Sequence, residues 1–260
     1  MLRYFAWQIR SRFQEKVKVR WVDGSNLVVR AGMTGATGNV YCGLHEFPEM
    51  GFLLHVLRSG DLFCDIGANV GSYTILASAV VGAETIAFEP VAETVRRLFD
   101  NIHANLISPL VTVHVVVLGA QDGTINFTVG HDTMNHVATA KDQLSQPFPM
   151  RSLDTVLCGR CPVFLKIDVE GYEKEVFSGA QKTLENPSLS AISTELFTPA
   201  MSEMLGRVGF RRFHYDPYSR ALTTHKNSWN HSNALLVRDF DLVQQRLKSA
   251  PSFKVFGTEI

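Results

Sequence analysis

The stretch from residue 63 to residue 71 constrains the fold of this chain more than any other part of it. An apolar run ends at Asp65, and Ile-Gly-Ala-Asn-Val-Gly follows, with Gly67 and Gly71 four positions apart. A segment of helical character then begins at Ser72. Glycines allow a tight turn and a close approach of the backbone to a ligand. The pattern therefore predicts a buried strand, a ligand-binding turn and a helix, in that order.

The rest of the chain continues this alternation of strands and helices. Strands are predicted at 62–66, 85–88, 111–118, 163–168, 189–195, 210–215 and 233–238. Helices are predicted at 46–58, 72–81, 91–106, 172–184, 201–208 and 239–248. Such alternation predicts a doubly wound α/β fold with a mostly parallel, seven-stranded sheet, in which the late strand pair supplies an antiparallel edge.

Residues 1–45 are expected to form an extension, and residues 46–260 a single globular unit. The extension begins with a helix over 1–13, continues with a hairpin over 17–29 and ends in a glycine-rich loop over 32–43. Within the larger unit, residues 123–129 predict an extra hairpin, and residues 130–150 are polar and irregular. Irregular segments of that length are often functional.

Composition narrows the function classes. The 260 residues carry 25 basic and 25 acidic side chains, so no overall positive field favours nucleic acid. No apolar run reaches the ~20 residues of a membrane span, although the helix over 1–13 admits peripheral membrane contact as an alternative to packing on the domain. The four cysteines suggest no disulfide framework, which indicates a cytoplasmic protein. The C-x-x-C of Cys158 and Cys161 lacks the second pair that a zinc site needs.

The spacing in the glycine turn favours S-adenosylmethionine (AdoMet) over a dinucleotide. D-x-G-x-x-x-G replaces the dinucleotide pattern G-x-G-x-x-G, and AdoMet has cationic groups but no phosphate. Glu89 ends the next strand at a distance suited to an acid that binds ribose hydroxyls, although it also suits a helix N-terminus. The third strand ends at Leu118-Gly119, where the chain could contact the adenine. An alternative interpretation is that the stretch is a glycine-rich turn of another kind of α/β protein.

Two further acids follow the fourth and fifth strands of the predicted sheet. Asp168 and Glu195 would lie at neighbouring strand tips. Methyl transfer to an alcohol needs a positioned acceptor and a base or a metal. The pair could hold Mg²⁺, orient the acceptor, or serve only as a helix cap and a solvated side chain. His136, in the irregular segment, is an alternative base, and His45 a weaker one.

Several segments together resemble the FkbM-type methyltransferases. They are Asp65-Ile-Gly-Ala-Asn-Val-Gly-Ser-Tyr-Thr74, Phe88-Glu-Pro90, Lys166-Ile-Asp-Val-Glu-Gly171 followed by Glu173, and Ser178-Gly-Ala180. Asn135-His136 together with Tyr215-Asp-Pro-Tyr-Ser-Arg220 resembles one branch of the family. The resemblance implies a class I, Rossmann-like methyltransferase fold and O-methylation of sugars, glycolipids or natural products. Carried over by position, it implies that Asp65, Gly67, Asn69, Gly71 and Glu89 bind AdoMet, that Glu46 assists near the methionine end, and that Asp168 and Glu170 lie beside the acceptor.

The sequence therefore predicts an AdoMet-dependent O-methyltransferase that acts on a hydroxyl, most simply of a sugar in a glycan, glycolipid or polysaccharide precursor, with S-adenosylhomocysteine as product. The alternatives are a non-sugar acceptor, a catalytically degenerate binding scaffold, and an NAD-dependent oxidoreductase. The missing G-x-G-x-x-G argues against the oxidoreductase.

Overall fold

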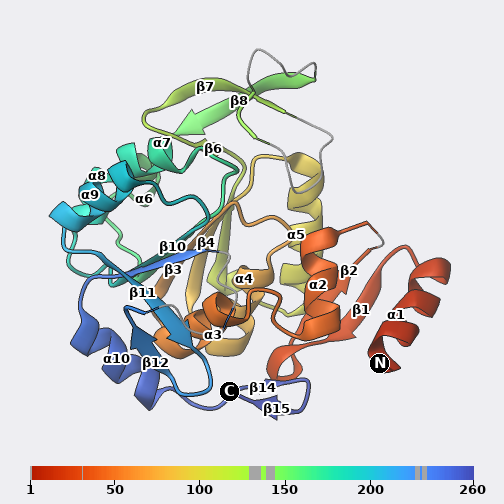
Figure 1. The fold of residues 1–260 in the computed structure, drawn as a ribbon. Coiled ribbons are helices and arrows are strands. Elements are labelled where there is room, and N and C mark those ends of the chain that lie inside the picture. The colour runs from red at the N-terminus through yellow and green to blue at the C-terminus, as the bar shows by residue number, and fades with distance from the viewer. Residues whose placement is uncertain (1, 31, 129–135, 139–143, 226–228, 230–232) are drawn as a thin grey trace.

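A central sheet of eight strands organises the molecule, in the order β12-β11-β13-β10-β9-β3-β4-β5 (Figure 1). The computed structural model describes residues 2–30, 32–128, 136–138, 144–225, 229 and 233–260. The strands are β3 (Leu62–Ile66), β4 (Glu84–Phe88), β5 (Val111–His114), β9 (Phe164–Ile167), β10 (Ala191–Thr194), β11 (Arg211–Asp216), β12 (Ala221–Thr223) and β13 (Ala234–Val237).

The strand directions confirm the predicted doubly wound fold. Strands β10, β9, β3, β4 and β5 run parallel, whereas β13 is antiparallel to β10, and β11 and β12 continue the antiparallel edge. The seven predicted strands are all present, and the short β12 adds an eighth at the edge.

Helices cover both faces of the sheet because alternate residues of the central strands enter different cores. Phe63 of β3 packs with α3 (Phe47–Val56), α4 (Ser72–Ile75, continued by a π-helical segment Leu76–Val81) and α10 (Phe240–Ser249). Its neighbour Cys64 packs with the opposite core of α6 (Leu153–Leu157), α7 (Glu173–Ser178), α8 (Gln181–Glu185) and α9 (Pro199–Arg207). Strands buried on both faces explain the continuous apolar runs of the sequence.

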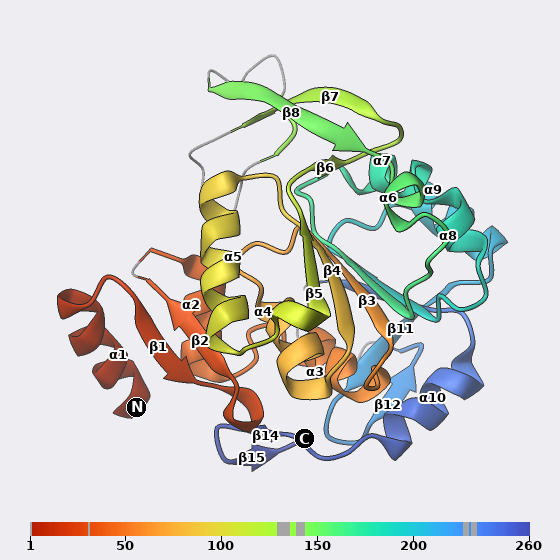
Figure 2. The ribbon, with the colours of Figure 1, turned by 180° about the vertical axis from the view of Figure 1, so that it is seen from behind.

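The N-terminal segment packs against α5 (Ala92–Ala104), as Figure 2 shows. It consists of α1 (Leu2–Phe13), the antiparallel strands β1 (Val17–Arg20) and β2 (Asn26–Val29), and α2 (Thr34–Cys42). The Asn101 Oδ1 atom on α5 accepts a hydrogen bond from the Val28 amide at 2.7 Å, and Asn105 Oδ1 accepts one from Asn26 at 2.7 Å. We propose that residues 1–45 are an extension attached to the unit of residues 46–260 through these contacts.

The predicted loop over residues 32–43 is wrong, because most of it forms α2. Glycine and threonine disfavour a helix locally, but Met33, Ala36 and Val40 recur at helical spacing and are buried in the core. Tertiary packing therefore overrides local propensity here.

Two other segments also differ from the prediction. The strand expected over 111–118 divides into β5 and β6 (Val117–Leu118), and β6 belongs to a small sheet with β7 (Gly123–Thr128) and β8 (Ser145–Arg151). Strand β8 lies in the part predicted to be irregular and contains Pro147 and Pro149. Within the described residues, β6 pairs only with Met150 and Arg151, so the rest of β8 has no ladder bonds on that side, where prolines are tolerated.

The helix predicted over 172–184 is interrupted between α7 and α8. Gly179 lies at the break, where an added Cβ would collide with the carbonyl oxygen of Gly119. The chain ends in a short hairpin of β14 (Lys254–Val255) and β15 (Thr258–Glu259). Within the described residues, none of the helices has the length and apolar character to cross a membrane.

Candidate active site

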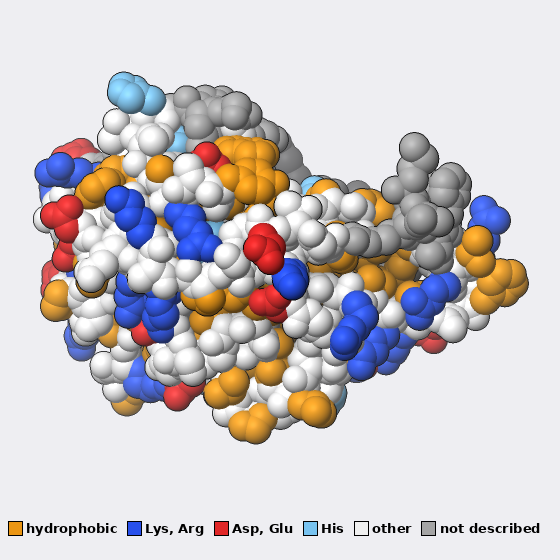
Figure 3. Space-filling view, turned by 90° about the horizontal axis from the view of Figure 1, so that it is seen from below, with side chains coloured by type: hydrophobic (Ala, Val, Ile, Leu, Met, Phe, Trp, Pro, Cys, Tyr) orange, Lys and Arg blue, Asp and Glu red, His pale blue; other side chains and the backbone are white. Residues whose placement is uncertain are grey.

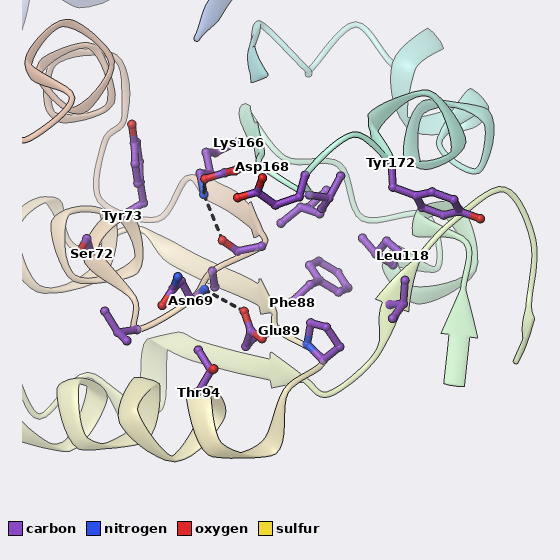
Figure 4. A pocket seen from close by; sticks show the side chains of 18 of the residues that line it. Asn69, Ser72, Tyr73, Phe88, Glu89, Thr94, Leu118, Lys166, Asp168 and Tyr172 are labelled. Atoms are coloured by element: carbon purple, nitrogen blue, oxygen red, sulfur yellow. Dashed lines mark hydrogen bonds and ion pairs between the residues drawn. The ribbon is translucent and has the colours of Figure 1, made fainter. Parts of the chain in front are cut away.

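A cavity of about 500 Å³ opens at the carboxyl ends of β3, β4 and β9 (Figure 4). The chain proceeds from β3 to β4 and β5 on one side, and β9 and β10 lie on the other side of β3. Ligands of doubly wound sheets bind at such switch points, and the volume falls within the roughly 300–1,000 Å³ of small-molecule sites. Its walls include Phe88, Leu118, Phe127 and Val137, which are apolar.

The glycine turn forms one wall of this cavity. Gly67, Asn69 and Gly71 have φ angles of 73°, 51° and 89°, in the left-handed region that glycine tolerates. A Cβ at Gly67 would collide with the carbonyl oxygen of Asp168, so this turn passes directly against the end of β9. The amide of Gly67 donates to the Phe88 carbonyl at 3.0 Å, which attaches the turn to β4 as well.

Glu89 lies beside the turn at the end of β4. Its Oε2 accepts a hydrogen bond from the Asn69 amide at 3.1 Å (Figure 4). Its Oε1 accepts one from the Val91 amide at 3.0 Å. Burial raises the pKa of Glu89 to about 7, although these amides oppose the shift. The carboxyl group lines the cavity and is therefore placed to receive hydroxyl groups of a ligand.

Lys166 connects the turn to the acids, a role that was not predicted from the sequence. It lies in β9 and is almost fully buried. Its Nζ donates to Asp168 Oδ2 at 2.9 Å and to the Gly67 carbonyl at 3.0 Å, and lies 3.9 Å from Asp65 Oδ1. Burial alone would lower the pKa of Lys166, but the carboxylates of Asp168, Asp65 and Glu46 raise it above its usual value. A lysine inside the apolar strand Phe-Leu-Lys-Ile was the available signal.

Asp65 lies beneath the turn rather than on the cavity wall. Its side chain is fully buried, and Oδ2 accepts a hydrogen bond from Thr74 Oγ1 at 2.7 Å. Burial raises the pKa of Asp65, and Lys166 opposes that shift. Gly71 and Gly119 are also absent from the described lining, and Gly119 donates to the Arg151 carbonyl at 3.0 Å. Direct contact of these three residues with a ligand stays a prediction.

Glu46 does line the cavity, and two side chains orient it. The Tyr73 hydroxyl donates to Glu46 Oε2 at 2.7 Å, and Asn233 Nδ2 donates to Oε1 at 3.0 Å. Burial raises the pKa of Glu46, and Lys166 opposes the shift. Tyr73 also lines the cavity, and this role was not predicted from the sequence because its hydroxyl contacts Glu46 only in the folded chain.

Asp168, Glu170 and Glu195 meet at the tips of β9 and β10, where each offers an oxygen within 4.8 Å of the others. Burial, followed by the charges of Asp168 and Glu170, raises the pKa of Glu195 to about 7. Asp168 and Glu170 line the cavity, whereas Glu195 is absent from the described lining. Such a cluster can take up a cation or share a proton, and the geometry alone does not favour Mg²⁺, which the sequence left as one of several possible roles for the pair.

The two candidate histidines occupy different places. His45 lines the cavity, whereas His136 is absent from the described lining. The His136 amide donates to Thr128 Oγ1 at 2.8 Å, which joins it to the end of β7. Burial raises the pKa of Glu170 and His136 opposes that shift, so the imidazole is close enough to influence the acid cluster.

The doubly wound sheet, with a glycine turn and acids at its switch point, defines a class I methyltransferase fold. The sequence model of the Methyltransferase FkbM domain matches residues 65–215, which is more than half of the chain. The protein therefore belongs to the FkbM methyltransferase family.

Individual proteins show more distant likeness. The chain is 28% identical over 139 residues to the hexuronic acid methyltransferase AglP of Haloferax volcanii, which covers 52% of this chain and 56% of that relative. The match thus spans about half the length of the curated relative. Among solved structures, an rRNA methylase from Streptococcus thermophilus aligns with a TM-score of 0.43, 13% identity and coverage of 72% of this chain and 91% of that one. A precorrin-6y C5,15-methyltransferase from Geobacter metallireducens aligns with a TM-score of 0.42, 15% identity and coverage of 75% and 88%.

Proposed function

We propose that this protein is an AdoMet-dependent O-methyltransferase that methylates a sugar hydroxyl in a glycan, glycolipid or polysaccharide precursor. One observation carries the proposal: a single cavity brings together the glycine turn, the buried carboxyl of Glu89 and the acid at Asp168. Membership of the FkbM family supports the same activity.

The lining of the cavity fits the chemical parts of AdoMet. Phe88 and Leu118 offer apolar surface for an adenine, and Glu89 offers carboxylate oxygens for the ribose hydroxyls. Glu46 offers a carboxylate for the ammonium group of the methionine part. When bound, AdoMet supplies an electrophilic methyl group.

Asp168 and Glu195 are the proposed acceptors of the hydroxyl proton. On transfer of that methyl group to the acceptor oxygen, the hydroxyl proton would pass to this carboxylate pair. A carboxyl group whose pKa lies near 7 is matched to that task, because it is ionised in a useful fraction at neutral pH. Lys166 holds Asp168 in place through the 2.9 Å ion pair. His136 stays an alternative base.

The proposed acceptor class rests on one relative and on the acid cluster. AglP is named for methylation of a hexuronic acid, and a sugar hydroxyl would need the positioning and base that the acid cluster offers. A non-sugar natural product is the alternative acceptor. The four free cysteines fit a reducing compartment, so we propose that the reaction takes place in the cytoplasm.

The end of α1 favours peripheral contact with an anionic membrane that carries such a precursor. Ile9 and Phe13 are 60% and 84% exposed, and Arg10 and Arg12 lie in the same last turn. Figure 3 shows hydrophobic and basic side chains together at its right-hand end, where Figure 1 places α1. Cosedimentation with phosphatidylglycerol vesicles tests this contact, and Phe13→Ser should weaken it.

Calorimetry with S-adenosylhomocysteine, followed by transfer of labelled methyl groups to hexuronic-acid oligosaccharides, tests the main proposal. The unmutated protein should bind S-adenosylhomocysteine, and Glu89→Ala should weaken binding. Glu84→Ala is the matched control, because Glu84 begins the same strand with an exposed side chain. No heat of binding from the unmutated protein would refute the proposal, and comparison of Asp168→Asn with His136→Ala separates the candidate bases.

A further inference from the structure

Three aromatic side chains gather next to the cavity and have no part in the site described above. Phe47 begins α3, Tyr218 lies in the turn after β11, and Trp229 follows β12. Ring centroids are 4.9 Å apart for Phe47 and Trp229, 5.3 Å for Phe47 and Tyr218, and 5.8 Å for Tyr218 and Trp229. These three residues are called the aromatic cluster.

The strand directions place the aromatic cluster along the same edge of the sheet as the acids. Strand β11 runs in the direction of β10 and ends at Asp216, two residues before Tyr218. Strand β13 runs the opposite way and therefore begins at this edge, where Ala234 pairs with Thr194, the residue before Glu195. The edge therefore continues from the acid cluster towards Tyr218.

Glu46 connects the cavity to the aromatic cluster directly. Its carboxylate lines the cavity, its Oε1 accepts the hydrogen bond from Asn233, and the next residue along the chain is Phe47. Phe47 of the aromatic cluster therefore directly follows a residue of the cavity wall.

Asp216 holds the aromatic cluster in a defined arrangement. Its Oδ1 accepts hydrogen bonds from Trp229 Nε1 and from the Tyr218 amide, both at 3.1 Å, and its Oδ2 accepts one from Ser219 Oγ at 2.9 Å. The same turn packs on α3, because a Cβ at Gly51 would lie 2.7 Å from Pro217. Tyr218 nevertheless stays 55% exposed, so its ring is positioned without being buried.

The arrangement suits a sugar ring. A pyranose presents C–H groups on its faces and hydroxyl groups around its rim, so it packs flat on an aromatic ring while nearby polar side chains bind the rim. We propose that the aromatic cluster is a subsite that binds a sugar ring of the acceptor glycan, adjacent to the ring whose hydroxyl lies at Asp168. The identity of that glycan as methyl acceptor rests on the proposed function, whereas binding of sugar at Tyr218 does not.

Saturation-transfer NMR measures this binding without requiring methyl transfer. A mixture of hexuronic-acid-containing and neutral tetrasaccharides is presented to the unmutated protein, Tyr218→Phe and Tyr218→Ala, each with S-adenosylhomocysteine. We expect saturation of the sugar C–H protons in the first two proteins and about fivefold to tenfold weaker binding in Tyr218→Ala, the order of one lost aromatic contact. Equal affinity of all three for S-adenosylhomocysteine in calorimetry shows that the variants fold.

Two results would overturn the subsite: no sugar signal from the unmutated protein, or the same sugar affinity in Tyr218→Ala. The outcome is separate from that of the proposed function. Sugar binding that depends on Tyr218 without any methyl transfer would remove the function and keep the subsite. Methyl transfer with a KM for the sugar unaffected by Tyr218→Ala would keep the function and remove the subsite.

Discussion

Replacement of Lys166 by methionine tests whether this buried ammonium group organises the site. Methionine keeps the length of the side chain and removes the charge, which leaves Asp65 buried with only its hydrogen bond from Thr74. The side chains of Lys166 and Asp65 are 5% and 1% exposed, and their charged atoms lie 3.9 Å apart. Two unit charges at that distance attract by about 4 kcal/mol at an effective dielectric constant of roughly 20.

Proton uptake by Asp65 gives a similar loss of stability. In Lys166→Met, Asp65 can avoid a lone buried charge by taking up a proton. At pH 7 that costs about 4 kcal/mol relative to an unfolded pKa of roughly 3.9, and at pH 5 about 1.5 kcal/mol. The folded variant then binds more protons than its unfolded chain, so its stability falls as pH rises between these values. The deficit against the unmutated protein should therefore widen from pH 5 to pH 7.

Thermal and urea unfolding measure this effect. A loss of about 4 kcal/mol corresponds to a decrease in Tm of roughly 8–16 °C for a chain of this size. In a double-mutant cycle, Asp65→Asn combined with Lys166→Met should lose less than the two single changes together, because no charge is left unpaired. A decrease in Tm below about 2 °C, a deficit independent of pH, or strict additivity would refute the reasoning.

Three further predictions follow from the site. The affinity for S-adenosylhomocysteine should rise about tenfold from pH 6 to pH 8, because Glu89 ionises through its raised pKa of about 7. In calorimetry, Glu89→Gln should bind S-adenosylhomocysteine more weakly and without this pH-dependent rise. Gly67→Ala should destabilise the protein by about 3 kcal/mol or more in urea unfolding. Gly60→Ala is the control and should cost about 1 kcal/mol, because Gly60 also has a positive φ but no atom lies within 4 Å of the added Cβ. Similar losses in the two variants would contradict the predicted collision. If Glu195 shares in proton removal, kcat/KM for the acceptor at saturating AdoMet should increase with pH through about 7, and Glu195→Gln should abolish that increase. An unchanged profile would favour His136.

Local patterns in the sequence were sufficient to predict the succession of strands and helices along the chain and part of the site. Strand β3 was predicted with its observed bounds, and the turn from Gly67 to Gly71 followed from glycine spacing. Glu89 and Asp168 were predicted at strand ends, and both line the cavity. These predictions depend on interactions between neighbours in sequence and on the rule that parallel strands present their carboxyl ends at one edge, so they need no knowledge of the packing.

Only the tertiary structure decided which groups touch. It showed Lys166 between Asp65 and Asp168, placed Asp65 beneath the cavity rather than on its wall, and made a helix of the segment that ends at Cys42. It also brought Tyr218 to the edge that carries the acids. Charge pairing and burial act between residues distant in sequence, and their strength depends on separations of a few ångströms that local patterns do not encode. The sequence by itself therefore determined the fold class and the glycine turn, and the three-dimensional packing determined the ion pairs and the surroundings of the proposed acceptor.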